Sequence, residues 1–195
     1  MDAYKRQCFV YQTVIMHYVQ NNKMEIAEKI AKDVVKRVCH YNLPEECSLY
    51  SFRMQDLVMD AMTKFKAMEA LFNDLTQDLT LDNATEIFHR SVEEMFQHEL
   101  NWGRLVSVYM LGAAVAKRLQ ETSTKADVKQ FTKEVFVPTM RQHVSPWVHA
   151  HGGWNAFLRF FAERHDAEQD DQSRFAIQLI ALGITMLSTI TYFYR

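Results

Sequence analysis

Hydrophobic residues recur every three or four positions through most of this chain, and no long stretch alternates every second residue. That spacing is typical of helices with one buried face rather than of strands. It predicts helices over residues 24–41, 48–79, 84–99 and 102–119, with a further apolar stretch over 3–20. The pattern therefore predicts an all-α fold.

The segment 102–119 differs from the others because it is apolar on nearly every side until Lys117. A helix without a polar face has to be surrounded by other helices. The segment is therefore predicted to be the central helix of a bundle.

Polar residues and prolines predict where several helices begin and end. Asn83, with Glu86 three residues later, predicts an N-cap, and Thr124 with Asp127 predicts a second one. Pro138 is expected to bend or end the helix that follows Thr124. Ser145, followed by proline, is expected to cap a short helix that closes at residues 152–153, before a last bundle helix over 154–164.

The last part of the chain has a different character. Residues 175–194 contain no charged side chain, and as a helix they would span about 30 Å, the thickness of a bilayer core. We expect this segment to be a membrane anchor that leaves the preceding residues in the cytosol. Its several threonines and serines leave open a buried C-terminal helix instead. The expected organisation is an extension over 1–23, a bundle over 24–165 and a charged linker over 166–174.

Charge and cysteine content narrow the range of functions. The 22 Lys and Arg residues are outnumbered by 24 Asp and Glu residues and are spread along the chain, which argues against nucleic acid as a partner. Three cysteines fit a reducing compartment better than a disulfide scaffold. Cys39, His40 and Cys47 could be drawn as a metal site, but lone residues of these types on helices are more often packing or surface residues, and no metal is predicted.

Signatures of catalysis are missing as well: the chain has no glycine-rich phosphate loop, His-Glu-x-x-His run or nucleophile elbow. We expect no enzymatic activity, no cofactor and no small-molecule substrate.

The sequence "NWGR" stands at the start of the predicted central helix. Asn101 fits an N-cap, and Trp102 would lie in the first turn. Gly103 costs about 1 kcal/mol relative to alanine there, a cost tolerated where another backbone approaches closely. Arg104 offers a planar fork that suits a carboxylate. Two interpretations remain open on these residues alone. They could form a binding site for an acidic group of a partner, or they could be a surface arginine beside a structural glycine.

"NWGR", then "WVHAHGGWNAFLRFF" over 147–161, a charged linker and an apolar tail together resemble the Bcl-2 family of apoptosis regulators. The two motifs look like that family's first and second homology regions, and the resemblance covers residues 24–195. It implies a bundle of about eight helices around a central apolar hairpin. It also implies a hydrophobic surface groove, formed by the helices that hold 48–79, 84–99, 102–119 and 154–164, which binds amphipathic BH-three type helices of pro-apoptotic family members.

The resemblance also implies roles for individual residues. Arg104 would pair with an aspartate of the incoming helix, Gly103 would permit its close approach, and Asn101 would bond near the same aspartate. Trp102 and Trp154 belong to the same expected site. The candidates for the apolar floor, each of which could instead be plain core, are Val58, Met62, Phe65, Met68, Phe72, Val92, Met95, Phe96 and Val106.

The chain departs from the family pattern at two places. Residues 97–100 replace an Asp-Gly pair common before "NWGR". In the third homology region Asp56 is present, but Ser51 stands in place of leucine and Gln55 in place of a small residue. Such a helix would be a poor ligand for another groove, which favours an anti-apoptotic member. The resemblance and the apolar tail imply a location at the cytosolic face of the mitochondrial outer membrane, with the endoplasmic reticulum as a second expected site. The alternatives are a pore-forming executioner of the same family and a scaffold unrelated to cell death.

Overall fold

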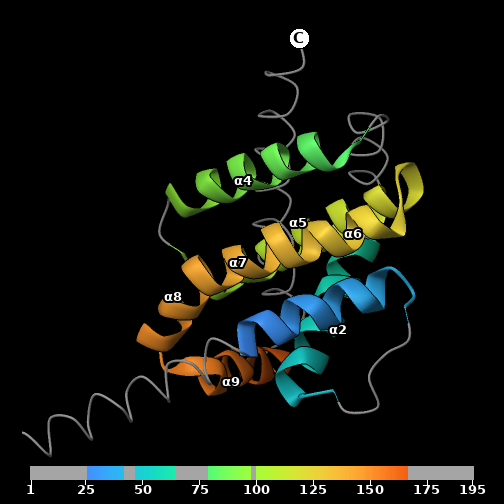
Figure 1. The fold of residues 1–195 in the computed structure, drawn as a ribbon. Helices are drawn as coiled ribbons and strands as arrows, with labels where there is room; N and C mark the ends of the chain where they lie inside the picture. The colour runs from blue at the N-terminus through green and yellow to red at the C-terminus, as the bar shows by residue number, and fades with distance from the viewer. Residues whose placement is uncertain (1–25, 42–46, 65–78, 98–99, 167–195) are drawn as a thin grey trace, which may run out of the picture.

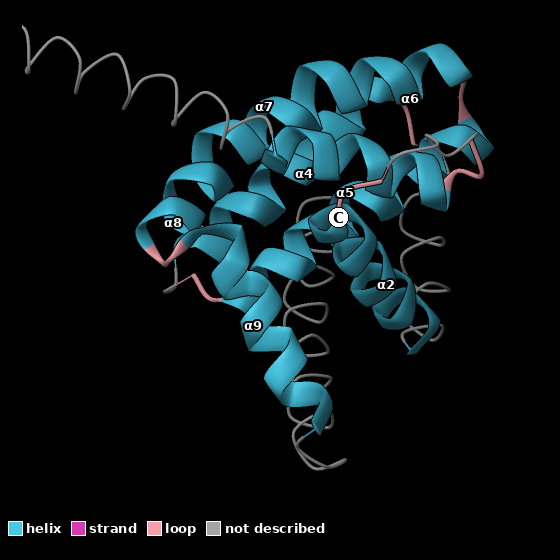
Figure 2. Ribbon diagram, turned by 90° about the horizontal axis from the view of Figure 1, so that it is seen from below, coloured by secondary structure: helices cyan, strands magenta, loops and turns pink. Residues whose placement is uncertain are grey.

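The computed structural model describes residues 26–41, 47–64, 79–97 and 100–166. All regular secondary structure within these ranges is helical, as predicted (Figure 2). A first helix runs over residues 26–38. It is followed by α2 (Leu49–Lys64), α4 (Leu81–Gln97), α5 (Trp102–Thr122), α6 (Lys125–Phe131), α7 (Val137–Thr139), α8 (Ser145–Ala150) and α9 (Gly153–Asp166).

Helix α5 is the central helix, as its apolar sequence predicts. It packs against α2, α4 and α6, and its buried residues lie on every side of the helix. In Figure 1, α4 lies along the top of the bundle and α9 along the bottom, with α5 to α7 between them. A helix buried on all sides gains the hydrophobic free energy of each apolar residue that it contributes.

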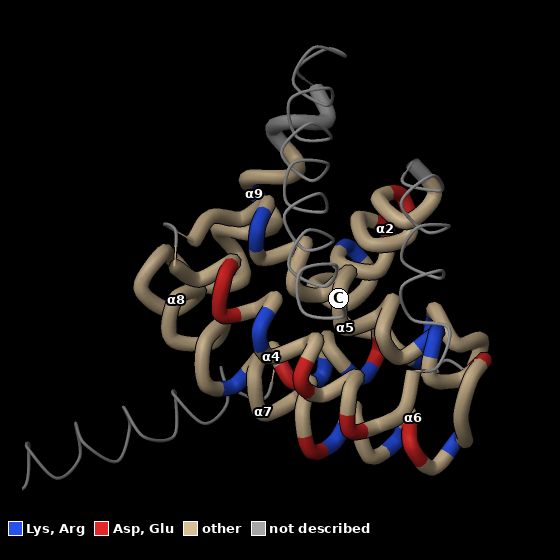
Figure 3. Tube along the Cα trace, turned by 90° about the horizontal axis from the view of Figure 1, so that it is seen from above, with Lys and Arg blue, Asp and Glu red and all other residues tan. Residues whose placement is uncertain are grey.

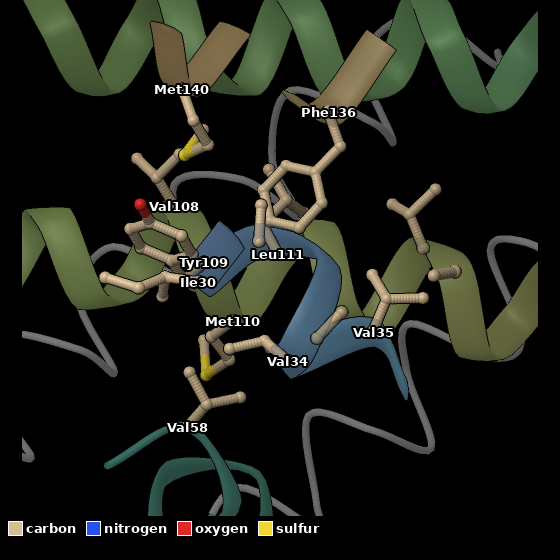
Figure 4. Packing of buried hydrophobic residues seen from close by; sticks show 14 of the residues in the cluster. Ile30, Val34, Val35, Val58, Val108, Tyr109, Met110, Leu111, Phe136 and Met140 are labelled. Atoms are coloured by element: carbon tan, nitrogen blue, oxygen red, sulfur yellow. The ribbon is translucent and has the colours of Figure 1, made fainter. Parts of the chain in front are cut away.

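Side chains of α5 point in opposite directions to reach different neighbours (Figure 4). Tyr109 lies beside Ile30 of the first helix, and its hydroxyl donates a hydrogen bond to the Ala27 carbonyl at 3.1 Å. Complete burial raises the pKa of Tyr109 well above its usual value of 10.0. Met110 points instead toward Val58 of α2.

A cluster of aromatic rings fills the space between α4, α5 and α6. Phe136 meets Phe88 edge-on with ring centres 5.5 Å apart, and it meets Tyr109 at 5.9 Å. Gly112 of α5 passes directly beneath Phe136, and a Cβ built on this glycine would overlap the ring. The glycine therefore allows α5 and the Phe136 segment to pack closely.

The prediction that Pro138 bends or ends its helix is wrong in the second respect, because the helical path continues to Ala150. Pro138 lies in α7, between two π-helical stretches, Thr132–Phe136 and Met140–Val144. The Val137 N–H donates to the Thr132 carbonyl five residues back rather than four. A π-turn of this kind shifts the hydrogen-bond ladder, so that the missing proline N–H does not end the helix.

Two predicted N-caps, Asn83 and Ser145, are also wrong. Asn83 lies inside α4, where its side chain accepts a hydrogen bond from the Thr80 N–H at 2.7 Å, so the helix begins earlier than predicted. Ser145 lies in continuous helix, and its buried hydroxyl has no hydrogen-bond partner. Thr124 and Asp127 form the expected capping box. Gly152 and Gly153 adopt φ of 88° and 73°, conformations that favour glycine, where α8 ends.

The described ranges contain no helix that is both long and apolar enough to cross a bilayer. The predicted anchor over 175–194, the linker over 167–174 and the stretch over 3–20 lie outside the residues that the structure describes, so those predictions stand untested.

Candidate functional site

The first turn of α5 has the capped geometry that "NWGR" predicts. Asn101 has an extended backbone, and its side-chain oxygen accepts a hydrogen bond from the Arg104 N–H at 2.9 Å. The Asn101 carbonyl accepts the first helical bond, from the Leu105 N–H, also at 2.9 Å. Asn101 is therefore the N-cap of α5. The cap fixes the direction in which the first turn, and Arg104 with it, leaves the preceding loop.

Gly103 and Arg104 occupy different environments within this turn. Gly103 is buried, and its carbonyl accepts a hydrogen bond from the Ser107 hydroxyl at 3.1 Å. Arg104 is half-buried and lies where the unpaired N–H groups of a helix start create a positive partial charge. The helix start and the guanidinium therefore both favour an anionic partner.

Trp102 connects the start of α5 to α8 and α9. Its ring meets Trp147 edge-on with centres 4.7 Å apart, and it lies 5.9 Å from Phe157 and 6.5 Å from Phe160. Trp154 is buried on α9 and meets Phe157 at 5.5 Å. Trp102 therefore holds the two sequence motifs together, whatever it contributes to partner binding.

The described candidates for the apolar floor lie on α2, α4 and α5, and α2 and α4 each pack against α5. Four of them, Val58, Val92, Met95 and Val106, are buried members of the main hydrophobic core. Met62 and Phe96 are half-buried at its edge. Phe96 also stacks on His143, with ring centres 5.2 Å apart. Phe65, Met68 and Phe72 lie outside the described residues.

The unusual residues of the third homology region lie in the interior of α2. Ser51 is fully buried and accepts a hydrogen bond from the Ser48 hydroxyl at 3.1 Å. Gln55 is also buried, and its amide donates to the Cys47 sulfur at 3.3 Å. Asp56 is exposed on the opposite side. The polar substitutions noticed in the sequence therefore have partners inside the fold.

Two hydrogen bonds that the sequence analysis missed join α2 to α9. The Tyr50 hydroxyl donates to the Asn155 side chain at 2.8 Å, and Arg53 donates to the Phe161 carbonyl at 3.0 Å. These pairs lie more than a hundred residues apart in the chain, so no local pattern could have revealed them. They form a polar connection between the third and second homology regions.

The charges at the start of α5 favour an anionic group over a cationic one. Within the described ranges, no three His, Cys, Asp or Glu side chains are grouped so as to hold a metal ion. Cys39 is buried, and this burial raises the pKa of its thiol from 9.0 to about 11. Its thiol is consequently protonated near neutral pH.

Comparison with known proteins decides the family. Residues 58–154 match the family described as apoptosis regulator proteins, Bcl-2 family. The chain belongs to the Bcl-2 family. The family consists of non-enzymatic apoptosis regulators, which agrees with the prediction that the chain is not an enzyme.

Relatives and solved structures fall within the same family. Apoptosis regulator R11 of Xenopus laevis is 26% identical over 144 residues, which cover 71% of this chain and 69% of R11. Bcl-2-like protein 1 of Homo sapiens is 29% identical over 107 residues, which cover 53% of this chain and 46% of that protein. The chain thus spans about half the length of this human relative.

Two solved complexes share the fold. The Trichoplax adhaerens protein trBcl-2L2, bound to trBak BH3, is 22% identical with a TM-score of 0.62, and the match covers 71% of this chain and 99% of that one. The zebrafish pro-survival protein NRZ, in complex with Bad BH3, is 18% identical with a TM-score of 0.61, and the match covers 73% and 96%. These matches confirm the all-α Bcl-2 fold.

Proposed function

We propose that this protein is an anti-apoptotic regulator. It captures the amphipathic BH3 helices of pro-apoptotic Bcl-2 family members and so blocks permeabilisation of the mitochondrial outer membrane. The observation that carries the proposal is the Asn101-capped start of α5, with Arg104 in its first turn. Two proteins of the same fold support it, because trBcl-2L2 and the pro-survival NRZ are each bound to a BH3 segment.

Capture depends on charge and on apolar contact. The Arg104 guanidinium forms an ion pair with an aspartate of the incoming helix, and the positive end of α5 adds to the attraction. Gly103 adds no side chain at the closest approach of the two backbones. Met62 and Phe96, half-buried at the edge of the core, offer apolar surface to the other anchors of the helix.

The packing of α2 supports a guardian rather than an executioner. Ser51 and Gln55, which stand where an executioner's own BH3 helix needs a leucine and a small residue, are buried within the fold. Tyr50 and Arg53 fasten the same helix to α9. Opening α2 to serve as a ligand would break these hydrogen bonds and would leave Ser51 as a weak anchor. In a liposome assay we expect the protein to block dye release by an executioner and to cause none itself.

In this proposal, residues 175–194 anchor the protein in the membrane. As a tail anchor, they would hold the bundle at the cytosolic face of the mitochondrial outer membrane. Fluorescence microscopy of cells that express the full chain or a chain ending at residue 174 tests this part separately from helix capture.

The test of capture is the substitution Arg104→Ala. Loss of the pair with the aspartate is expected to cost about 2–5 kcal/mol, mostly because one charge is left buried and unpaired. We expect the dissociation constant for a pro-apoptotic BH3 peptide, measured by isothermal titration calorimetry, to rise at least tenfold, since about 1.4 kcal/mol corresponds to one factor of ten.

The matched control is Arg118→Ala, because Arg118 is also a half-buried arginine of α5 but lies at its other end. We expect Arg118→Ala to leave peptide affinity within twofold of the unmodified protein. Equal affinity of the Arg104 variant and the unmodified protein would remove the assigned role of Arg104. Failure of every pro-apoptotic peptide to bind the unmodified protein would favour the scaffold alternative.

A further inference from the structure

The first helix carries a concentration of positive charge that its sequence alone does not reveal. Lys29, Lys32, Lys36 and Arg37 lie at spacings of three, seven and eight residues, which places them on one side of a helix. Lys29, Lys32 and Arg37 are exposed and Lys36 is half-exposed. We call these four residues the basic face.

The two carboxylates of this helix do not balance the basic face at the surface. Glu28 is 9% exposed and accepts a hydrogen bond from Arg141 of the second π-helical stretch at 2.6 Å. Asp33 is only 2% exposed, although it lies between the lysines in sequence. The surface that this helix presents to water is therefore cationic, whereas the Arg141–Glu28 ion pair is neutral overall.

The cations of the basic face are also not neutralised by neighbours. No ion pair within the described residues involves them, whereas Arg90 pairs with Glu86 and Arg118 pairs with Glu121. Helix α6 also carries exposed lysines, but residues of both signs occur around α6 and α4 (Figure 3). The basic face is thus a single-sign surface on a chain whose formal net charge is −2.

We propose that the basic face docks on an anionic lipid surface and so orients the bundle on the membrane. An anionic bilayer attracts a cluster of Lys and Arg side chains with about 1 kcal/mol for each, without an apolar anchor. Protein interfaces rely instead on buried aromatic or apolar anchors. Among the described residues the exposed large hydrophobic side chains are Leu49 and Phe52, both on α2 and not on the first helix. The surface therefore fits lipid head groups better than an acidic protein.

This inference uses the proposed anchoring by residues 175–194 but not the proposed capture of BH3 helices. A tethered bundle stays close to its bilayer, so a weak attraction is enough to select one orientation. The basic face would then turn toward the lipid.

Lysine acetylation provides a direct test with an internal control. The full chain is bound to phosphatidylcholine vesicles with or without phosphatidylserine and treated with an amine-reactive acetyl ester, and each site is quantified by mass spectrometry. We expect phosphatidylserine to slow acetylation of Lys29, Lys32 and Lys36 roughly fivefold. The exposed lysines at 125 and 129 of α6, and at 133 of the π-helical stretch that follows it, should be unaffected. High salt should remove the protection, because it screens exposed charges.

A pair of variants with equal loss of charge completes the test. K29Q/K32Q/K36Q should slow the association of the full chain with phosphatidylserine vesicles at least tenfold in a stopped-flow assay, while K125Q/K129Q/K133Q should change this rate less than twofold. Circular dichroism and BH3-peptide binding, expected to be unchanged in both, separate this result from a failure of folding or of helix capture.

Three outcomes would overturn the proposal. Equal protection of all six lysines, or equal effects of the two variants, would show a diffuse charge effect rather than a docking face. Protection that does not depend on phosphatidylserine would exclude recognition of anionic lipid. Protection by a soluble acidic peptide but not by vesicles would assign the basic face to an acidic protein.

Discussion

Gly112→Ala tests how closely the central helix is packed. In an unpacked helix this substitution stabilises by about 1 kcal/mol, because alanine is the better helix former. At this position the new methyl group would overlap the edge of the Phe136 ring. That ring is fully buried and held by Phe88, Phe131 and Tyr109 around it.

The net effect follows from these two opposing terms. Overpacking a core costs about 1–3 kcal/mol, and the helix propensity of alanine returns about 1 kcal/mol. We therefore expect a net loss of up to about 2 kcal/mol in the free energy of unfolding. The measurement is urea denaturation followed by circular dichroism, with the slope m checked for constancy so that the midpoint reports stability.

A double-mutant cycle with Phe136→Leu identifies the cause. If the methyl group clashes with the ring, the loss caused by Gly112→Ala should be smaller in the Phe136→Leu background, with an interaction energy of about 0.5–2 kcal/mol. A Gly112→Ala protein that is more stable than the unmodified one would refute the packing argument. Exact additivity in the cycle would show that the ring is not the source of the loss.

Three other substitutions test separate parts of the fold. Tyr109→Phe, which removes the hydrogen bond to the Ala27 carbonyl, should lower the free energy of unfolding by about 1 kcal/mol in the same denaturation assay, and no change would show that this bond does not contribute. Hydrogen bonds from the Ser123 hydroxyl, and then from the Thr124 hydroxyl and N–H, lower the pKa of Asp127. The contribution of Asp127 to stability is therefore present above the unfolded-state pKa and is lost as the pH falls through the lower folded value, so Asp127→Asn should weaken the acid-side dependence of the free energy of unfolding on pH. In a protein that carries both Cys8→Ser and Cys47→Ser, Cys39 is the remaining thiol and should react with a maleimide only at the rate of unfolding. Rapid labelling at neutral pH in native buffer would contradict its burial.

The sequence by itself determined the helical class, the central helix and the family. A helix without a polar face is stable only when all its sides are buried, and α5 is surrounded by other helices as this requires. Asn101 and Thr124 were predictable as caps because a capping side chain bonds to backbone groups only two or three residues away. Capping pairs can therefore be predicted from the spacing of residues in the sequence.

Tertiary structure decided what depends on partners far away in the chain. The ring that Gly112 faces, the α9 residues that hold Tyr50 and Arg53, and the basic face left when Asp33 is buried all arise from packing between helices. Pro138 could not be interpreted from the sequence alone either. Local rules predict that a proline ends a helix, but the π-turns on either side of Pro138 let the helix continue. One-dimensional spacing fixes which residues share a helical face, whereas the free energy of each contact depends on which other face it meets.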